Sequence, residues 1–514
     1  MMKIKVLLLF FLLSALVFGQ KQVKIIWPSL ANSPLPILRG DVQGTGRSEF
    51  VGPRTLHIAW QKDMPYGIMR GPVIGYNDNL YMGTDLLGDS VNHFYAVDHN
   101  SKDLWTFNTP GYVPNNGGPI LARDSTVYFF SANQYLYALN KNGSLKWKVN
   151  IWANLYPQLP IDLSGNLYVP VKDTLCVISP EGFISNKIYL PKIGPALSFS
   201  VGGDTIFALI GPAINYGQPG SLTAIDLSGN ILWAYSFPYH NAGIPLVDNQ
   251  NKIYVFGADS NKQCFLYCMK SNGTVDWKYS VPSIYEGYSP TMDKNGNIVF
   301  FNERTVNNIK YGVIISLDYS GHEKWVTPLE GDWWHNWVSL GLVCDAEGKI
   351  YGGGTAPGGN FYCLDSNGVI LWKYTSGIFE YDSCPAIGSD GTLYIGYHND
   401  GSVFCTQNLI AIKDSITSVI NDGVENIKGY QLLQNYPNPF NPNTKIIYQI
   451  PKSGLVMIIV FDILGNKVAT LVNQYKSKGN YEVNFNSAKF SSGVYFYQIR
   501  VNDFVSSKKM VLTK

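Results

Sequence analysis

The sequence has little charge: Asp, Glu, Lys and Arg make up 15% of the 514 residues, where about 25% is usual in globular domains. Lys and Arg number 39 against 37 Asp and Glu, so the formal net charge is +2. No basic block of the kind that follows a phosphate backbone is present, and we expect no nucleic acid partner. The scarcity of charged helix faces, with 50 Gly and 28 Pro, favours an all-β chain rich in turns.

Cysteine and histidine are few and scattered. The seven cysteines are an odd number at long spacings, which indicates no disulfide framework. The seven histidines form no HExxH pair, and no paired Cys or His has the spacing of a zinc site. The Gly-rich run 352–359 lacks the Gly-Lys-Ser/Thr ending of a phosphate loop, so a hairpin is the better interpretation. The sequence therefore assigns no catalytic residue and no metal ligand.

Long hydrophobic runs are limited to the N-terminus. Lys3 and Lys5 precede an apolar run from Val6 to Phe18, and Gly19 offers a small residue for cleavage. A membrane anchor needs about 20 apolar residues, so we interpret residues 1–19 as a secretory signal peptide. No later stretch is long and apolar enough to span a bilayer, and we predict no transmembrane segment.

One unit recurs along most of the chain. Its first half is a proline or leucine, a short strand, a polar turn and a second strand. Eight copies begin at Pro72, Pro119, Pro160, Pro195, Pro245, Pro290, Leu342 and Pro385. Its second half is an alternating strand, a Gly turn and a tryptophan, at Trp105, Trp147, Trp233, Trp277, Trp325 and Trp372. A degenerate copy from Cys176 to Asn186 lacks the tryptophan.

The eighth tryptophan strand is missing after Leu409, and Thr55–Trp60 supplies a matching strand at the start. Repeats of about 45 residues with four strands each are typical of propeller blades. The sequence therefore predicts an eight-bladed β-propeller over residues 55–414, closed by a strand from its own N-terminal end. We expect the turn glycines to adopt positive φ and the tryptophans to pack between blades.

These residues resemble the pyrroloquinoline-quinone-type propeller repeats, whose pattern is matched by Ala224, Asp226, Gly229 and Trp233. The lead-in, residues 20–54, is similar to the segment before the first blade in that family. The resemblance implies the fold, and it raises a quinoprotein enzyme with a central quinone and calcium as an alternative. No two cysteines are consecutive, whereas those enzymes carry an adjacent Cys pair, so we expect neither cofactor. Arg39-Gly40-Asp41 spells an adhesion tripeptide within the lead-in, and we give it little weight.

After a polar linker at 415–429, residues 430–514 show short alternating strands with the spacing of an immunoglobulin-like β-sandwich. This segment resembles the type A C-terminal sorting domain of the type IX secretion system. The matching residues are Asn435, Tyr436, Pro437, Asn438, Pro439, Phe440, Asn441, Pro442, Gly493, Tyr495 and Lys509. The resemblance implies type IX machinery as a partner and passage across a Gram-negative outer membrane to the cell surface or the medium.

The connections between repeats are rich in aromatic and amide side chains, which suit the faces and hydroxyls of sugar rings. The candidate ligand-binding residues are Tyr112, Tyr156, Tyr239, His240, Tyr285, Trp333, Trp334, His335, Trp337 and Tyr381. Alternatively, these rings only pack the loops on the propeller. We predict an exported binding protein for a polysaccharide or a protein. Two alternatives stay open: a quinoprotein-like or lyase-type enzyme that uses the central pocket, and a non-catalytic assembly scaffold.

Overall fold

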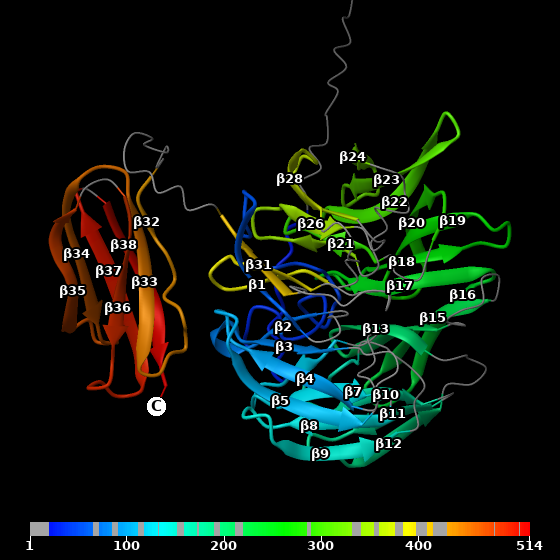
Figure 1. Ribbon diagram of the computed structural model, residues 1–514, viewed down its shortest axis with the longest axis horizontal. Coiled ribbons are helices and arrows are strands. Elements are labelled where there is room, and N and C mark those ends of the chain that lie inside the picture. The colour runs from blue at the N-terminus through cyan, green and yellow to red at the C-terminus, as the bar shows by residue number, and fades with distance from the viewer. Residues whose placement is uncertain are drawn as a thin grey trace, which may run out of the picture. The chain divides into compact units, whose positions relative to one another are not determined.

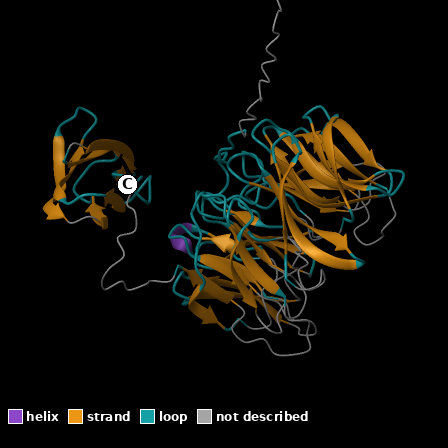
Figure 2. Cartoon of the chain, turned by 90° about the horizontal axis from the view of Figure 1, so that it is seen from above, coloured by secondary structure: helices purple, strands orange, loops and turns teal. Residues whose placement is uncertain are grey.

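The computed structural model describes most of the chain and divides it into two compact units, Met1–Ser415 and Ile416–Lys514. Apart from one short 3-10 turn, η1 (Tyr76–Asp78), the regular elements of the described residues are all strands (Figure 2). The all-β prediction is confirmed. None of the described helices is long and apolar enough to cross a membrane. The structure describes residues 20–64, 71–84, 91–110, 118–131, 133–151, 159–171, 174–189, 196–210, 219–284, 289–330, 341–353, 359–375, 384–396, 409–414, 429–476, 479–502 and 504–513.

The described part of the first unit forms seven four-stranded sheets and one three-stranded sheet, all antiparallel. Three sheets follow the lead-in: β2 (Val73–Ile74), β3 (Leu80–Gly83), β4 (Val91–Val97), β5 (Asp103–Pro110); β6 (Ile120–Leu121), β7 (Val127–Ser131), β8 (Tyr135–Leu139), β9 (Leu145–Asn150); and β10 (Leu167–Val171), β11 (Thr174–Ile178), β12 (Ile184–Tyr189). Two more are β13 (Ala196–Gly202), β14 (Thr205–Ile210), β15 (Gly220–Asp226), β16 (Ile231–Phe237); and β17 (His240–Val247), β18 (Ile253–Ala258), β19 (Cys264–Met269), β20 (Val275–Val281).

The last three sheets of this unit are β21 (Thr291–Met292), β22 (Ile298–Val306), β23 (Ile309–Leu317), β24 (Glu323–Pro328); β25 (Val343–Cys344), β26 (Ile350–Gly353), β27 (Asn360–Leu364), β28 (Ile370–Thr375); and β29 (Ala386–Ile387), β30 (Leu393–Gly396), β31 (Leu409–Lys413) with β1 (His57–Lys62). β1 pairs antiparallel with β31, from His57 opposite Lys413 to Lys62 opposite Leu409. Figure 1 shows blue β1 beside yellow β31. The predicted pairing of the first strand of the repeat region with its last strand is confirmed.

Tryptophans link seven of the eight described sheets of this unit to the next one. Each indole N–H donates to a backbone carbonyl in the neighbouring sheet or, for Trp372, to Pro53. The pairs are Trp60–His99, Trp105–Lys141, Trp147–Pro180, Trp233–Ser271, Trp277–Tyr319, Trp325–Ser366 and Trp372–Pro53. Asn186 pairs with Val177 in the register that Trp147 has with Ala138, and Ile188 packs against Gly229 where the tryptophan is lost.

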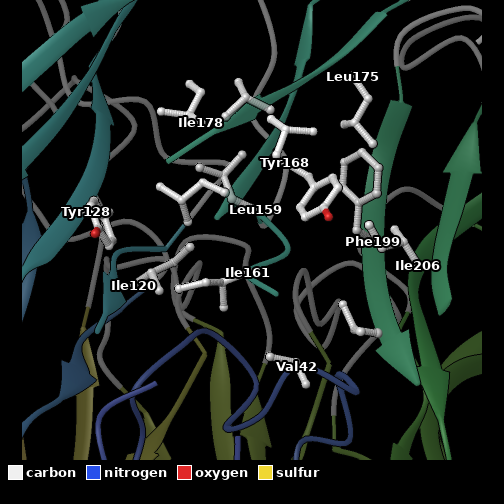
Figure 3. Packing of buried hydrophobic residues seen from close by; sticks show 14 of the residues in the cluster. Val42, Ile120, Tyr128, Leu159, Ile161, Tyr168, Leu175, Ile178, Phe199 and Ile206 are labelled. Carbon is white, nitrogen blue, oxygen red and sulfur yellow. The ribbon is translucent and has the colours of Figure 1, made fainter. Parts of the chain in front are cut away.

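The core of the first unit continues from the sheets into the lead-in. One cluster joins Val42 of the lead-in to Ile120, Ile161 and Phe199, which come from successive sheets (Figure 3). The turn glycines have positive φ, as predicted, at Gly143, Gly229, Gly273, Gly321 and Gly368. The repeat cysteines Cys268 and Cys363 are fully buried and serve as small core side chains.

The second unit consists of two antiparallel sheets. One contains β32 (Gln431–Leu432), β33 (Asn443–Ile450) and β36 (Gly479–Asn486). The other contains, in order, β35 (Lys467–Lys476), β34 (Gly454–Phe461), β37 (Gly493–Val501) and β38 (Phe504–Leu512). Alternate residues of both sheets, including Ile446, Ile458 and Ile499, enclose one hydrophobic cluster. The two sheets therefore face each other across a shared core.

Candidate functional site

The lead-in runs across one end of the innermost strands of the first unit. We call residues 27–50 the inner segment. Its carbonyl oxygens accept hydrogen bonds from the last or next-to-last residue of successive inner strands: Pro36 from Leu121 of β6 (2.8 Å), Val42 from Val201 of β13 (2.7 Å), Gln43 from Val247 of β17 (2.9 Å), Thr45 from Met292 of β21 (2.9 Å) and Gly46 from Cys344 of β25 (2.8 Å). Since neighbouring residues bond to neighbouring sheets, the inner segment ties the ends of these strands together.

Arg39 is fully buried within this arrangement. Its Nε donates to the carbonyl of Gly44 at 3.0 Å, and its Nη2 donates to the carbonyl of Pro290 and to Oγ1 of Thr291. Burial lowers the pKa of Arg39 from its ordinary value. Asp41 is also buried, and its Oδ1 accepts the N–H of Thr45. The adhesion tripeptide therefore has a structural role and is not exposed to a partner.

The end of the lead-in is held by a buried polar cluster. Asp345 Oδ2 accepts the N–H of Gly52 at 2.9 Å and pairs with Nζ of Lys349 at 2.8 Å. Burial disfavours the charged Lys349, but its hydrogen bonds to Asp345 and Glu347 outweigh this and raise its pKa. The Tyr351 hydroxyl donates to the carbonyl of Pro53 at 3.2 Å. Residues 52–53 are thereby fixed beside β1, which begins four residues later.

Most of the loop residues predicted to bind a ligand lie outside the described residues. These are Tyr112, Tyr156, Tyr285, Trp333, Trp334, His335, Trp337 and Tyr381. His240 begins β17, and its side chain is not described. Tyr239 is half-buried, with Nζ of Lys262 5.1 Å from its ring centre. The described residues therefore do not show these side chains together in one site.

Tyr239 and His240 lie at the start of the inner strand β17. β17 runs from His240 to Val247, about 20 Å at the usual rise of a strand. The inner segment bonds to Val247, so the connection that carries Tyr239 is at the opposite end of the strand. We call this end, where each connection enters an inner strand, the loop end.

A polar hollow that the sequence did not reveal lies between two sheets and begins at the loop end, where Val281 ends β20. It has a volume of about 430 Å³ and is lined by Tyr279, Ser280, Val281, Pro282, Arg304 and Glu323. Arg304 Nη2 donates to Tyr279 Oη at 2.8 Å and to Glu323 Oε2 at 2.7 Å. Tyr279 Oη also donates to Glu323 Oε2 at 2.6 Å. Burial and this bond raise the pKa of Tyr279 to about 12, so the hydroxyl stays protonated at neutral pH.

Nearby Glu303 is also unusual. Its side chain is 4% exposed and pairs with Nζ of Lys310 at 3.0 Å, while its Oε2 is buried without a hydrogen-bond partner. Ser283 Oγ is likewise buried without a partner.

Tyr279, Arg304 and Glu323 of the hollow come from β20, β22 and β24. Sequence reasoning could have placed them together only through the register of the repeats. A stretch Asn302-Glu303-Arg304 in a strand otherwise rich in apolar residues was the available signal.

In the second unit, the sorting-motif residues form a clamp on one sheet edge. Phe440 forms a parallel bridge with Leu512, and its N–H donates to the carbonyl of Val511 at 2.9 Å. Asn438 Oδ1 accepts the N–H of Val511 at 2.8 Å. Gln434 Nε2 donates to the carbonyl of Lys509 at 2.7 Å. Backbone and amide groups of the motif therefore satisfy the outer edge of β38, which would otherwise be open.

The other motif residues support this clamp or remain exposed. Asn435 is buried, and its backbone N–H donates to the Tyr497 hydroxyl at 2.7 Å. The Pro442 carbonyl accepts the N–H and hydroxyl of Ser487, both at 2.8 Å. Tyr436 is 44% exposed. Pro437, Pro439 and Asn441 are exposed as well. Gly493 begins β37, Tyr495 Oη donates to the Ser491 carbonyl, and Lys509 lies exposed on β38.

Among the described residues, no group of three His, Cys, Asp or Glu side chains is placed to hold a metal ion. The described cysteines Cys176, Cys264, Cys268, Cys344, Cys363 and Cys384 are free thiols. Burial raises the pKa of Cys268 and Cys363 to about 12. These thiols are therefore protonated at neutral pH.

Comparison with known proteins identifies the C-terminal unit. Residues 434–513 match the family model described as the secretion system C-terminal sorting domain. No curated protein matches the chain. The protein is therefore secreted through the type IX system to the cell surface or the extracellular space.

Solved structures similar to the chain include one described as a propeller. The Dos1 propeller is 11% identical, covers 71% of this chain and 94% of its own, and gives a TM-score of 0.49. The WD40 domain of Toxoplasma gondii coronin is 10% identical over 66% and 93% of the chains, with a TM-score of 0.37. PorZ, described as an essential bacterial surface component of the type-IX secretion system of Porphyromonas gingivalis, is 11% identical over 86% and 81%, with a TM-score of 0.22. The succession of four-stranded antiparallel sheets gives the first unit a propeller-like architecture.

Proposed function

We propose that the first unit is an eight-bladed propeller of the pyrroloquinoline-quinone repeat type, followed by an immunoglobulin-like sandwich. The tryptophan bonds support the blade count, because they link seven of the eight sheets to the next one and return from β1 to the turn before β5 through Trp60 and His99. The contact of Ile188 with Gly229 makes the remaining link. Trp372 reaches Pro53, beside the strand that completes the last sheet. The shared core of the two C-terminal sheets supports the sandwich.

We propose that this exported propeller is a binding protein whose ligand, a polysaccharide or a protein, is held at the loop end. The observation that carries the proposal is the hollow of Tyr279, Arg304 and Glu323. Arg304 lies six residues beyond Ile298, where β22 begins. Glu323, in contrast, pairs with Leu317, which pairs with Ile298, so the hollow extends from the loop end toward the end where the inner segment bonds to Met292.

The chemistry of the hollow suits a ligand rich in hydroxyl groups. A guanidinium and a carboxylate offer paired donors and acceptors in fixed positions, and a tyrosine ring offers a flat face to the C–H side of a sugar. The candidate residues on the connections, above all Trp333, Trp334 and Trp337, would add further stacking surfaces at the same end. We propose that binding requires neither pyrroloquinoline quinone nor calcium.

The test is a titration of the full-length protein with a panel of polysaccharides, followed by intrinsic tryptophan fluorescence. All 12 tryptophans precede residue 373, so the signal reports the propeller alone. We expect saturable quenching by one polysaccharide. The affinity should fall about tenfold or more in Arg304→Met and in the triple variant W333A/W334A/W337A. Arg123→Met, an exposed arginine in the turn after β6, is the matched control and should bind normally.

Other outcomes of this experiment contradict the proposal. A saturable response to pyrroloquinoline quinone with calcium, and to no polysaccharide, would support a quinoprotein enzyme instead. A second outcome is that no polysaccharide changes the fluorescence and that a protein partner is captured equally well by the wild type and by Arg304→Met. This outcome would support a scaffold that does not use this hollow.

A further inference from the structure

The two units carry opposite charge. Residues 430–514 contain ten Lys and Arg against three Asp and Glu, a net charge of +7. Residues 20–414 contain 26 Lys and Arg against 32 Asp and Glu, a net charge of −6. The near-neutral total of the whole chain conceals this difference. The excess of positive charge in so small a module points to a partner with negative charge.

Three of the module's ten cations lie with aromatic and other apolar residues on one face of the four-stranded sheet. Phe461 of β34 pairs with Lys467 of β35 on one side and with Phe496 of β37 on the other. Phe496 in turn pairs with Lys509 of β38. Directly paired residues in adjacent strands project to the same side of a sheet. Lys467, Phe461, Phe496 and Lys509 therefore form one row across all four strands.

A second row on the same face carries a third cation between apolar residues. Met457 pairs with Arg500, and Arg500 pairs with Val505. Residues between these positions, such as Val460, Tyr497 and Ile499, are buried and face the core. The rows therefore lie on the outer face of the sheet. We call this surface, made by Leu455, Met457, Ile459, Phe461, Phe496, Arg500, Val505, Lys467 and Lys509, the outer face.

Large apolar side chains are exposed on the outer face and at its end. Leu455 is 51%, Val505 55% and Phe496 38% exposed. In the turn between β34 and β35, Ile463 is 71% and Leu464 83% exposed. The turn is well built, because Asp462 Oδ1 accepts the N–H groups of Leu464 and Asn466, both at 2.9 Å. The two aliphatic side chains are thus held outward by a defined hydrogen-bonded turn.

No described carboxylate neutralises the cations of the outer face. Asp462 is occupied within its turn, where Oδ2 also accepts Nδ2 of Asn466 at 2.9 Å. Glu482 belongs to the other sheet and pairs with Lys445 at 3.0 Å. Asp503 lies outside the described residues. An apolar surface that carries three cations with no described carboxylate partner is complementary to an acidic surface that also carries apolar groups.

We propose that the outer face is the docking surface of the sorting module for a protein partner that presents acidic and apolar side chains during export. The partner buries Phe461, Phe496, Ile463 and Leu464 and pairs with Lys467, Arg500 and Lys509. This inference rests on the export function of the module and is independent of any ligand of the propeller. It also separates two roles in the module: the motif at 435–442 builds the β38 edge, while the outer face meets the partner.

The test compares matched double charge reversals of the full-length chain in a cell with an active type IX system. K467E/K509E changes the outer face, and K452E/K489E removes the same charge from exposed lysines outside the four-stranded sheet. The exported fraction is measured by cell fractionation and immunoblotting. We expect it to fall about tenfold for K467E/K509E and to stay near the wild-type value for K452E/K489E. Thermal unfolding by circular dichroism should be unchanged in both.

An apolar variant provides a second measurement. I463S/L464S leaves every charge and the hydrogen bonds of Asp462 in place, and we expect a similar loss of export. Normal export of K467E/K509E, or equal loss in both charge variants, would overturn the proposal. So would saturable binding of the purified protein to anionic phospholipid vesicles that K467E/K509E abolishes, because the occupant would then be a membrane. Normal export after deletion of residues 430–514 would instead refute the export function itself.

Discussion

The indole N–H of Trp105 in β5 donates a 2.9 Å hydrogen bond to the carbonyl oxygen of Lys141, in the turn between β8 and β9 of the next sheet. The ring lies against Gly143 of the same turn, where a Cβ atom would come within 2.5 Å of it. Gly143 has φ of +82°, so the turn also needs a residue that tolerates the left-handed region. The same pair recurs in Trp147 with Gly182 and Trp233 with Gly273.

Gly143→Ala should destabilise the propeller by about 2 to 5 kcal/mol. About 1 to 2 kcal/mol comes from the left-handed backbone and about 1 to 3 kcal/mol from overpacking against Trp105. Denaturant unfolding followed by tryptophan fluorescence measures the change.

Gly203→Ala is the matched control for this substitution. Gly203 has φ of +58°, and the nearest heavy atom to its Cβ position is 4.0 Å away. It should show only the backbone cost. Equal losses at Gly143 and Gly203 would mean that contact with Trp105 adds nothing to stability.

Arg39→Met should destabilise the propeller by about 3 to 5 kcal/mol, since it leaves the buried carbonyls of Gly44 and Pro290 without their donor. Arg39→Lys should recover only part of this loss, because an ammonium cannot reproduce the planar fork of donors. Unfolding midpoints by tryptophan fluorescence give both values. A neutral Arg39→Met would show that the inner segment stays in place without the guanidinium.

The repeat could be predicted from the sequence because its signals are local. The turn at Asn140–Gly143 and Trp147 lie within a few residues of each other, and alternation in β8 marks a strand with both faces covered. Eight copies of the first half of the repeat require eight tryptophan strands, and this count predicted that Thr55–Trp60 supplies the missing last one. The sorting module was evident because its motif is contiguous.

The inner segment and the polar hollow could not be predicted in this way. Residues 27–50 have no period, and their partners are remote in sequence, as Arg39 and Pro290 are. A charged residue such as Arg39 is ordinarily expected at the surface, so its full burial could not be inferred from residue type. Tyr279, Arg304 and Glu323 come from three strands of two sheets, and their convergence depends on how the sheets are placed. The loop residues from Tyr112 to Tyr381 remain a prediction.

The ion pair between Asp276 and Lys252 predicts a pH dependence in the acid range. Nζ of Lys252 lies 2.7 Å from Oδ2 of Asp276, and this hydrogen bond lowers the pKa of Asp276. A carboxyl whose folded pKa lies below its unfolded value of about 3.9 stabilises the fold at higher pH. That contribution is lost as the pH falls through the folded pKa.

Asp276→Asn should therefore reduce the free energy of unfolding at pH 7 by at most about 1 kcal/mol, the range for ion pairs in contact with solvent. The difference between the variant and the wild type should close as the pH falls from about 4, near the unfolded pKa, through the lower folded pKa. Denaturant titrations at a series of pH values check it. A difference that is constant across this range would mean that the loss does not come from the charge of Asp276.

The last prediction concerns the role of Asn438 in the sorting motif. Its Oδ1 accepts the N–H of Val511 at 2.8 Å, so it pairs an edge group of β38 as a neighbouring strand would. Asn438→Ala should cost about 1 to 2 kcal/mol and release that edge. Amide hydrogen exchange of residues 505–512 in the full-length protein should become faster.

Asn441→Ala is the control, since Asn441 is exposed in the same motif and forms no side-chain hydrogen bond within the described residues. It should leave exchange in β38 unchanged. If Asn438→Ala reduced export while exchange in β38 stayed slow, the motif would itself be a contact site for the export machinery. If exchange and export changed together, the motif would act through the β38 edge that it covers.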